Sequence, residues 1–306
     1  NLTLYAKWTP YIKYYVKSTA TSSLNSTSSW SGTKDGSGGS PLNFNSDKIF
    51  ILSNSSGSTS FTTGGNWSVD GAIQIPAGAT MNITSSTTTT LSNDITNNGI
   101  IIGASGSTLE LDGTTRQYLN GLNILNNLNS NNDDGISLLD STVILNALTL
   151  TDGTLYTNDE LTLRSTASNT AIVNAVVSGA AISGSVLVEQ YIPAKRAFRL
   201  ISSPVTTSTS IYENWQENGR NAAGYGTHIT GSKSGADGFD ATITGNRSLF
   251  GFSNSSGSWT NVSNTNTNTL SAGTPYRLMI RGDRTINLNS NDARPMNTAL
   301  RPRGTL

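Results

Sequence analysis

The chain has 306 residues, which is enough for about two domains of ordinary size. Only 12% of its residues are charged, and 19 Lys and Arg balance 19 Asp and Glu. A formal net charge of zero gives no electrostatic reason to expect nucleic acid or a membrane surface as a partner. Cysteine is absent, which excludes disulfides, thiolate metal sites and cysteine nucleophiles. No run approaches the roughly 18 apolar residues of a membrane helix, so direct membrane insertion is not expected.

The first ten residues, NLTLYAKWTP, alternate apolar and polar side chains and stop at a proline, which predicts a strand. We expect the chain to be a piece of a larger processed protein. Residues 11–41 begin with a second predicted strand. The rest of that segment is rich in Ser, Thr and Gly, which predicts a loop or linker.

Short β runs separated by Gly, Asn and Asp fill residues 42–190, as in KIFIL, TMNI, STLELDG and ELTLRS. An aliphatic–x–aliphatic run followed by Asn or Asp and Gly recurs at about the 20–25-residue spacing of solenoid coils. The pattern favours an all-β fold, a right-handed parallel β-helix. Inward Ile, Leu and Val would fill its bore, while Asn, Asp and Gly would take the corners. An antiparallel sandwich is the competing architecture.

The composition changes in residues 191–306, where aromatic side chains and most of the arginines are found. Strands are predicted at AFRLISSP, SLFGFSN, SWTNV, PYRLMIRG and RTINL, with Gly-rich turns between them. These features predict a β-sandwich-like domain. Its C-terminal edge is expected to be incomplete, because the closing RPRGTL resembles the start of a further strand.

The stretch VEQYIPAKRAFRL, residues 188–200, crowds bases and aromatics together at the change of composition. We interpret it as the seam between the two domains, with the rings of Tyr191 and Phe198 buried and Pro193 at a turn. The basic side chains are expected to pair with Glu189, Glu213 or Glu217. An anion-binding or polysaccharide-binding patch is the alternative. The seam residues are Tyr191, Pro193, Lys195, Arg196, Phe198 and Arg199.

Three stretches resemble surface proteins that Bacteroidetes export by the type IX secretion system, including the large adhesins of gliding Flavobacteria. They are GNWSVDGAIQIPAGATMNIT (65–84), VEQYIPAKRAFRLISSPV (188–205) with ENWQE (213–217), and GTPYRLMIRGDRTINL (273–288). The TLYAKW of residues 3–8 is similar to the end of the Listeria–Bacteroides repeat, which implies that residues 1–10 are the terminal strand of such a repeat lying upstream. The resemblance implies a long multidomain protein on the outer cell surface, with the type IX machinery as its partner during export. Ser141, in an Asp-Ser-Thr triplet, matches the short O-glycosylation pattern of that phylum.

Residues that could carry chemistry are few. His228 is the single histidine and is expected in an exposed loop. The tripeptide at residues 281–283 spells Arg-Gly-Asp, but MIRGDRTINL predicts a strand–turn–strand instead of an integrin ligand. Calcium could bind near Asp133 and Asp134, or among Asp237, Asp240 and Asn246, although neither set has the spacing of an EF-hand.

A carbohydrate-active β-helix would need paired carboxylates in a lateral groove. Glu110 and Asp112 lie two positions apart and therefore share one face of a strand. We expect no catalytic residue and no cofactor, and predict a non-enzymatic stalk or adhesive segment of a large exported adhesin. A carbohydrate-binding or carbohydrate-active β-helix protein is the alternative, with a surface polysaccharide as ligand.

Overall fold

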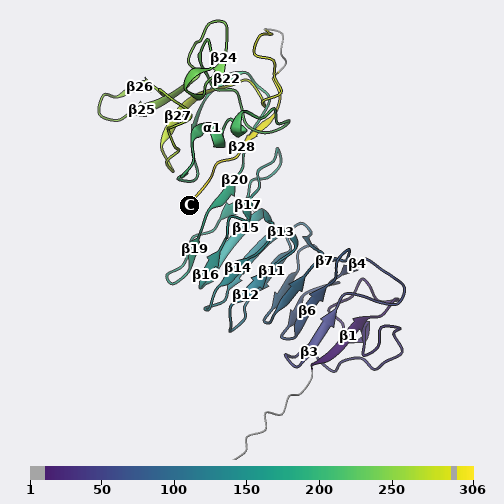
Figure 1. The fold of residues 1–306 in the computed structure, drawn as a ribbon. Helices are drawn as coiled ribbons and strands as arrows, with labels where there is room; N and C mark the ends of the chain where they lie inside the picture. The colour runs from purple at the N-terminus through teal and green to yellow at the C-terminus, as the bar shows by residue number, and fades with distance from the viewer. Residues whose placement is uncertain (1–10, 291–294) are drawn as a thin grey trace, which may run out of the picture. The chain divides into compact units, whose positions relative to one another are not determined.

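The computed structural model describes residues 11–290 and 295–306 (Figure 1). The chain is all-β and contains a β-solenoid of about six turns, which confirms the architecture predicted for its middle part. The strand predicted at residues 1–10 lies outside the described residues. The chain divides into a first unit, Asn1–Tyr156 with Val173–Ala181, and a second unit, Thr157–Ile172 with Ile182–Leu306. This division falls one coil before the boundary predicted at residue 190.

The strands of the first unit form sheets that run along the solenoid, one strand from each coil. One sheet comprises β1 (Ile12–Val16), β3 (Lys48–Ile51), β6 (Ala72–Ile75) and β9 (Ile95–Asn97), with β2 (Trp30–Ser31) antiparallel to β1. Another comprises β4 (Ser60–Thr62), β7 (Thr80–Ile83), β10 (Ile100–Gly103), β13 (Leu122–Asn131) and β15 (Thr142–Asp152), while β5 (Trp67–Val69), β8 (Thr88–Leu91) and β11 (Thr108–Leu111) lead into the second half of β13. A third comprises β12 (Gln117–Leu119), β14 (Ile136–Leu138) and β16 (Thr154–Tyr156). The 3-10 turn η1 (Thr27–Ser29) precedes β2, and β18 (Ile172–Val173) and β19 (Ala181–Ser183) contain residues of both units.

Successive coils pair in parallel and in register, so that like positions stack on one another. Leu91 pairs with Leu111, and Ile73 pairs with Ile95. Burial alternates along β6, β7, β8 and β11, because neighbouring side chains of a strand point to opposite faces of its sheet. Most of the inward side chains are aliphatic and almost fully buried, and each of these contributes about 1.5–3 kcal/mol to stability; the polar Thr89 is also buried. The alternation that predicted the solenoid is therefore the alternation that fills its bore.

The corners between strands need residues that can adopt a positive φ, and polar side chains that hydrogen-bond the backbone groups left unpaired there. Gly121 has a φ of 70°, and a Cβ at this position would lie 2.5 Å from the carbonyl oxygen of Asn97. The Nδ2 of the buried Asn97 donates to Oδ1 of Asn123, at 3.1 Å, one coil further along the stack. Asn123 in turn donates to the carbonyl oxygen of Gly121, at 3.0 Å. Asn and Gly recur at the corners because they meet these two requirements.

Gln117 forms a second buried set of hydrogen bonds at a corner. Its substitution tests how much these hydrogen bonds contribute to stability. Its Nε2 donates to the carbonyl oxygens of Leu91 and Asn93, at 2.8 and 3.0 Å, and its Oε1 accepts from Gly113 N and Asn132 Nδ2. Gln117→Ala would leave several buried groups without partners, so we expect the first unit to lose about 3 kcal/mol of stability. Hydrogen exchange of the β11 and β13 amides measures this loss.

The exposed neighbour of this site supplies the control. Thr114→Ala is expected to change the same amide protection by no more than about 0.5 kcal/mol, because substitutions at exposed positions have small effects. Equal protection in the two variants would show that the Gln117 contacts do not stabilise the coil.

Residues 11–41 were predicted to be a strand followed by a loop or linker, and they form a strand and a folded loop with buried residues. β1 pairs in parallel with β3, Tyr14 opposite Phe50, so it belongs to the first coil. Leu24 and Trp30 are fully buried. Short turns link them, and Ser29 Oγ donates to the Ser23 carbonyl oxygen at 2.6 Å. Ser and Thr are typical of linkers, but here they hydrogen-bond tight turns that cover the open end of the solenoid.

The second unit begins with a solenoid ladder that the end of the chain closes. β17 (Leu161–Leu163) pairs in parallel with β20 (Val186–Val188), and β29 (Arg303–Gly304) pairs antiparallel with β20. Next to them β21 (Gln190–Ile192) pairs antiparallel with β28 (Thr298–Leu300). The returning strand β29 covers the edge of β20, which would otherwise present unpaired backbone groups.

The remainder of the second unit is built on one four-stranded antiparallel sheet. Its order is β22 (Ala197–Ser202), β27 (Pro275–Ile280), β25 (Leu249–Ser253) and β26 (Ser258–Asn261). One face packs on a core that includes Trp215, Ile229 and Phe239. Those residues come from α1 (Ile211–Asn214) and from segments around η2 (Glu217–Gly219), η3 (Ala236–Gly238), β23 (Thr230–Ser232) and β24 (Asp240–Ala241). Ser210 and Glu213 form a capping box on α1.

The expected burial of Phe198 is wrong, because its side chain is 45% exposed. Phe198 and Leu200 occupy the same face of β22, which is opposite to the face of Ile201 that packs on the core. Tyr191 is partly buried in β21, whereas Pro193 is exposed. The stretch that we interpreted as a seam therefore presents one of its two aromatic rings to solvent.

The expected partners of the basic side chains also differ. Glu189 lies 3.6 Å from Arg164, and Glu217 lies 2.6 Å from Arg301. Glu213 caps the helix α1. Lys195 and Arg196 are exposed, and Arg199 donates to the carbonyl oxygen of Pro193 at 3.2 Å. Glu189 and Glu217 thus pair with arginines that are distant in sequence, and Glu213 caps a helix. The spacing of residues in the sequence does not indicate these partners.

Candidate functional site

The outward face of the four-stranded sheet carries a cluster of aromatic side chains around one arginine. The register places Arg277 between Leu200 on β22 and Phe250 on β25. Phe198 on the outer strand β22 pairs with Met279 on β27, and Trp259 on the outer strand β26 pairs with Phe252 on β25. We call this surface the aromatic face; its residues are Phe198, Leu200, Phe250, Phe252, Trp259 and Arg277.

Arg277 holds these rings in one surface. Its guanidinium carbon lies 4.5 Å from the ring centre of Phe250, 5.1 Å from that of Phe198 and 5.6 Å from that of Trp259. The rings of Phe252 and Trp259 are 5.1 Å apart and edge to face. Cation–π contacts of this kind are worth about 0.5–1 kcal/mol each at exposed sites. They also fix the orientation of rings that remain open to solvent.

Alternation along each strand explains why these side chains face outward. Tyr276, Leu278 and Ile280 are buried, so the residues between them, including Arg277, point to the opposite side. Leu200 is 74% exposed, which is unusual for a leucine in a sheet of a folded domain. The face of an aromatic ring can pack on the apolar face of a sugar ring, and a neighbouring arginine can donate hydrogen bonds to the sugar hydroxyls.

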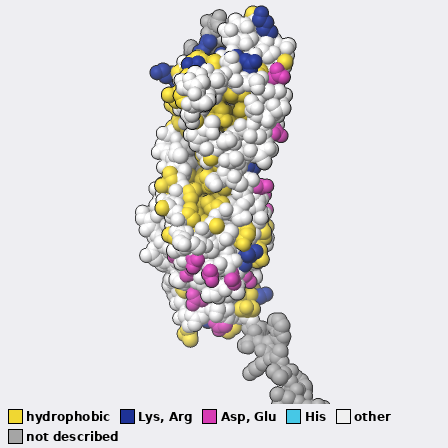
Figure 2. Space-filling model, turned by 90° about the vertical axis from the view of Figure 1, so that its left-hand side faces the viewer, with side chains coloured by type: hydrophobic (Ala, Val, Ile, Leu, Met, Phe, Trp, Pro, Cys, Tyr) yellow, Lys and Arg dark blue, Asp and Glu magenta, His cyan; other side chains and the backbone are white. Residues whose placement is uncertain are grey.

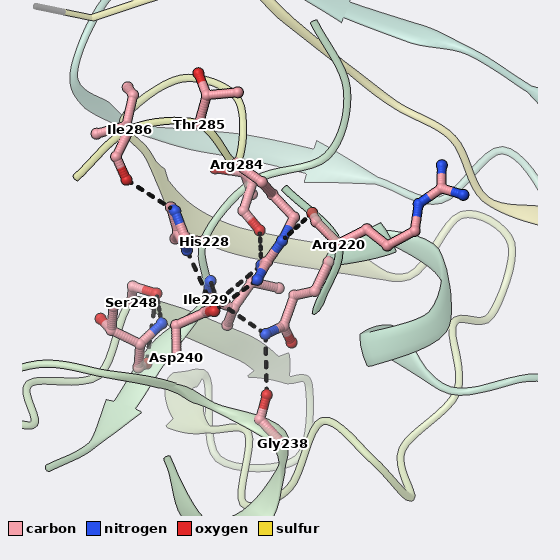
Figure 3. Close-up of polar contacts among 12 residues, drawn as sticks. Arg220, His228, Ile229, Gly238, Asp240, Ser248, Arg284, Thr285 and Ile286 are labelled. Atoms are coloured by element: carbon pink, nitrogen blue, oxygen red, sulfur yellow. Dashed lines mark hydrogen bonds and ion pairs between the residues drawn. The ribbon is translucent and has the colours of Figure 1, made fainter. Parts of the chain in front are cut away.

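A second polar centre lies inside the same unit, around Asp240 (Figure 3). The guanidinium of Arg284 donates to both carboxylate oxygens, at 2.9 and 2.8 Å, and Gln216 Nε2 donates to Oδ2 at 3.0 Å. His228 Nδ1 lies 3.2 Å from Oδ1, and its Nε2 is 3.0 Å from the carbonyl oxygen of Ile286. Burial by itself raises the pKa of Asp240, but the hydrogen bonds from His228 and Arg284 outweigh it and hold that pKa well below its usual range.

This centre corrects one prediction, the exposure of His228. His228 is not an exposed loop residue, since its side chain is only 13% exposed and lies against Asp240. Ser248, the hydroxyl drawn nearby in Figure 3, exchanges hydrogen bonds with the backbone of Thr230 and is not directed at the histidine. The arrangement therefore holds segments together and does not form a nucleophile–base pair.

The calcium and Arg-Gly-Asp hypotheses both need aspartates that are free to bind a ligand. Asp240 is occupied by Arg284, and no cluster of three or more His, Asp or Glu that could hold a metal lies within residues 11–290 and 295–306. Asp133 and Asp134 are exposed. Asp283 is 1% exposed and accepts from Gly224 N at 2.7 Å, so the tripeptide is not presented to a receptor.

Glu110, one of the acids of the solenoid, belongs to a polar ladder between neighbouring coils. Glu110 accepts hydrogen bonds from Asn129 Nδ2 at 2.9 Å and from Thr90 Oγ1 at 3.1 Å, each on a neighbouring coil. Thr151 Oγ1 extends this ladder to Asn129 at 2.7 Å. Neither of the two described pockets is lined by Glu110 or Asp112. Ser141 is exposed, as an acceptor of a glycan must be.

On the side shown in Figure 2, most of the described surface is uncharged polar side chain and backbone. Hydrophobic side chains gather there in patches, and charged side chains are few, as the composition predicted. No helix among the described residues has the length and apolar character needed to cross a membrane. No family model, curated protein or solved structure matches the chain.

The aromatic face was missed although its signal was present. Phe250 and Phe252 alternate on one strand, and Arg277 lies between buried positions of another. Pairing of these strands brings together residues up to about eighty positions apart, which one sequence does not show.

Proposed function

We propose that this chain is a non-enzymatic adhesive segment of a large exported bacterial cell-surface protein, and that it binds a surface polysaccharide. The observation that carries this proposal is the aromatic face, a cluster of rings around Arg277 in which Phe198 is exposed and Phe250, Phe252 and Trp259 are partly buried. The mostly uncharged solenoid surface suits a stalk that displays such a face without binding other molecules by charge.

The finer parts of this proposal come from the resemblance and the residue patterns. They are export by the type IX machinery, display outside the cell, glycosylation at Ser141, a right-handed coil and a β-sandwich-like second domain. A carbohydrate-active enzyme is the less favoured alternative, because Glu110 is bound into a structural ladder.

Affinity electrophoresis through gels that contain neutral or acidic polysaccharides tests the proposal. We expect at least one polysaccharide to retard the chain, and Phe198→Ala and Trp259→Ala each to weaken that retardation at least about 10-fold, since aromatic residues dominate such surfaces. Phe198→Ala should lower stability by about 1 kcal/mol or less, because its ring is already 45% exposed.

Tyr118→Ala is the matched control, because Tyr118 is an exposed aromatic residue of the first unit. Its retardation should equal that of the unmodified chain. A chain that no polysaccharide retards, or a Phe198→Ala variant that migrates like the unmodified chain in every gel, would contradict the proposal.

A further inference from the structure

A cavity of about 360 Å³ lies in the second unit, beside the start of β22 and the end of β27. Its polar lining includes Thr230, Thr242, Thr244 and Asn246, together with Arg196 and Arg281. None of the described residues that line it is acidic. We call it the arginine pocket.

Strand pairing brings the two arginines together. Ala197 and Ile280 form the last register pair of β22 and β27 at this end of the sheet. Arg196 precedes the first of these residues and Arg281 follows the second, so the backbone places the two side chains at neighbouring strand ends. Two guanidinium groups therefore share one pocket, although they lie far apart in the sequence.

Among the described residues that line the arginine pocket, none carries a negative charge that would balance the two arginines. Nη1 of Arg281 is buried and has no hydrogen-bond partner among the described residues. Burial, and then the like charge of Arg196, lower the pKa of Arg281. A guanidinium nevertheless stays protonated at neutral pH, so the pocket keeps two positive charges.

An oxyanion is the group that meets these requirements. Its oxygens accept hydrogen bonds from a guanidinium in a planar, charge-assisted geometry, and its charge relieves the repulsion between two cations. The threonine hydroxyls and the Asn246 amide can bind neighbouring hydroxyls. The cavity is at the lower end of the 300–1,000 Å³ range of small-ligand sites.

We propose that the arginine pocket binds an oxyanion-bearing ligand of about the size of one acidic sugar, a carboxylate or a sulfate, through Arg196 and Arg281. The site differs in residues and in ligand chemistry from the aromatic face. It stands whether or not that face binds a polysaccharide.

Titration calorimetry of the full chain at low ionic strength, with D-glucuronate, inorganic sulfate and D-glucose as separate probes, tests this site. We expect at least one of the two anions to bind and glucose not to bind. Arg281→Gln and Arg196→Gln should each weaken binding at least about 10-fold, and added salt should weaken it further. Glucuronate alone would identify a carboxylate, sulfate alone a sulfate ester, and both a general oxyanion site.

Lys195→Gln is the matched control, because Lys195 is exposed, adjacent to Arg196 and not part of the pocket lining. It should change binding by less than about 2-fold, since one exposed charge is largely screened. If Arg281→Gln does not fold, the binding measured for Arg196→Gln decides the result, because Arg196 is exposed and its substitution should not affect folding. The site is ruled out if neither anion binds the unmodified chain, or if Lys195→Gln weakens binding as much as Arg196→Gln.

Discussion

Trp30→Ala will destabilise the first unit by about 4 kcal/mol, in the range measured when a buried aromatic residue is truncated. Trp30 is fully buried, its ring centre lies 5.0 Å from that of Phe50 and 6.0 Å from that of Trp67, and its Nε1 donates to the carbonyl oxygen of Leu24 at 2.8 Å. The substitution leaves a cavity at the open end of the solenoid and removes the partner of that carbonyl. The effect should therefore be largest in the first coil.

Hydrogen exchange resolved by residue measures this loss in the full chain. Protection of the β1 and β3 amides should fall sharply, while the amides of β25 and β27 in the second unit should keep theirs. Tyr11→Ala is the control, because Tyr11 is an exposed aromatic residue of the same segment. If both variants lose the same protection, residues 11–41 act as the linker that their composition predicted.

Asp240→Asn will destabilise the second unit by about 3–5 kcal/mol, because it leaves the buried guanidinium of Arg284 without its countercharge. The Arg284 side chain is 5% exposed, and its other contacts are to the carbonyl oxygens of Arg220 and Thr227. Those carbonyls accept hydrogen bonds but carry no full negative charge. Protection of the β25 and β27 amides should fall, while Asp133→Asn, at an exposed acid of the first unit, should leave it unchanged.

The same residue predicts how stability depends on pH. The pKa of Asp240 is held well below its usual range in the folded chain by the hydrogen bonds from His228 and Arg284, in spite of burial. Its contribution is therefore fully present above the unfolded-state pKa of about 4 and is lost as the pH falls below that value. Melting temperatures recorded between about pH 6 and pH 2.5 should fall more steeply for the unmodified chain than for Asp240→Asn. Parallel curves would refute the role assigned to this carboxylate.

The sequence predicted the solenoid because its evidence is local and periodic. Each coil repeats the same alternation, so residues such as Ile73 and Leu91 indicate their own burial. The first coil escaped detection because Leu24 and Trp30 stand alone among Ser and Thr, with no periodic neighbours. The burial of a single apolar residue cannot be predicted from periodicity when its neighbours do not repeat.

The candidate sites could be predicted only in part, because they depend on contacts between distant segments. Arg196 was singled out from its local cluster, but its partner Arg281 was read only as part of a tripeptide. Asp240 and His228 were considered separately, and the arginine that links them to a distant loop, Arg284, was not. Side-chain alternation misplaces Phe198, because Phe198 and Leu200 alternate with the charged Arg199 and so predict an inward apolar face. In the structure that face of β22 is the exposed one, and Ile201 on the other face packs on the core.

The stacking of coils has a consequence for how this chain can change length in evolution. β7 and β8 pair with β10 and β11 at the same offset, Thr80 with Ile100 and Thr88 with Thr108. Duplication or loss of one such coil would bring like surfaces together again and leave every other coil as it was. A shift of a single residue within a strand would instead turn its aliphatic side chains toward water. Homologous chains are thus expected to differ by whole coils, with small insertions confined to the corners.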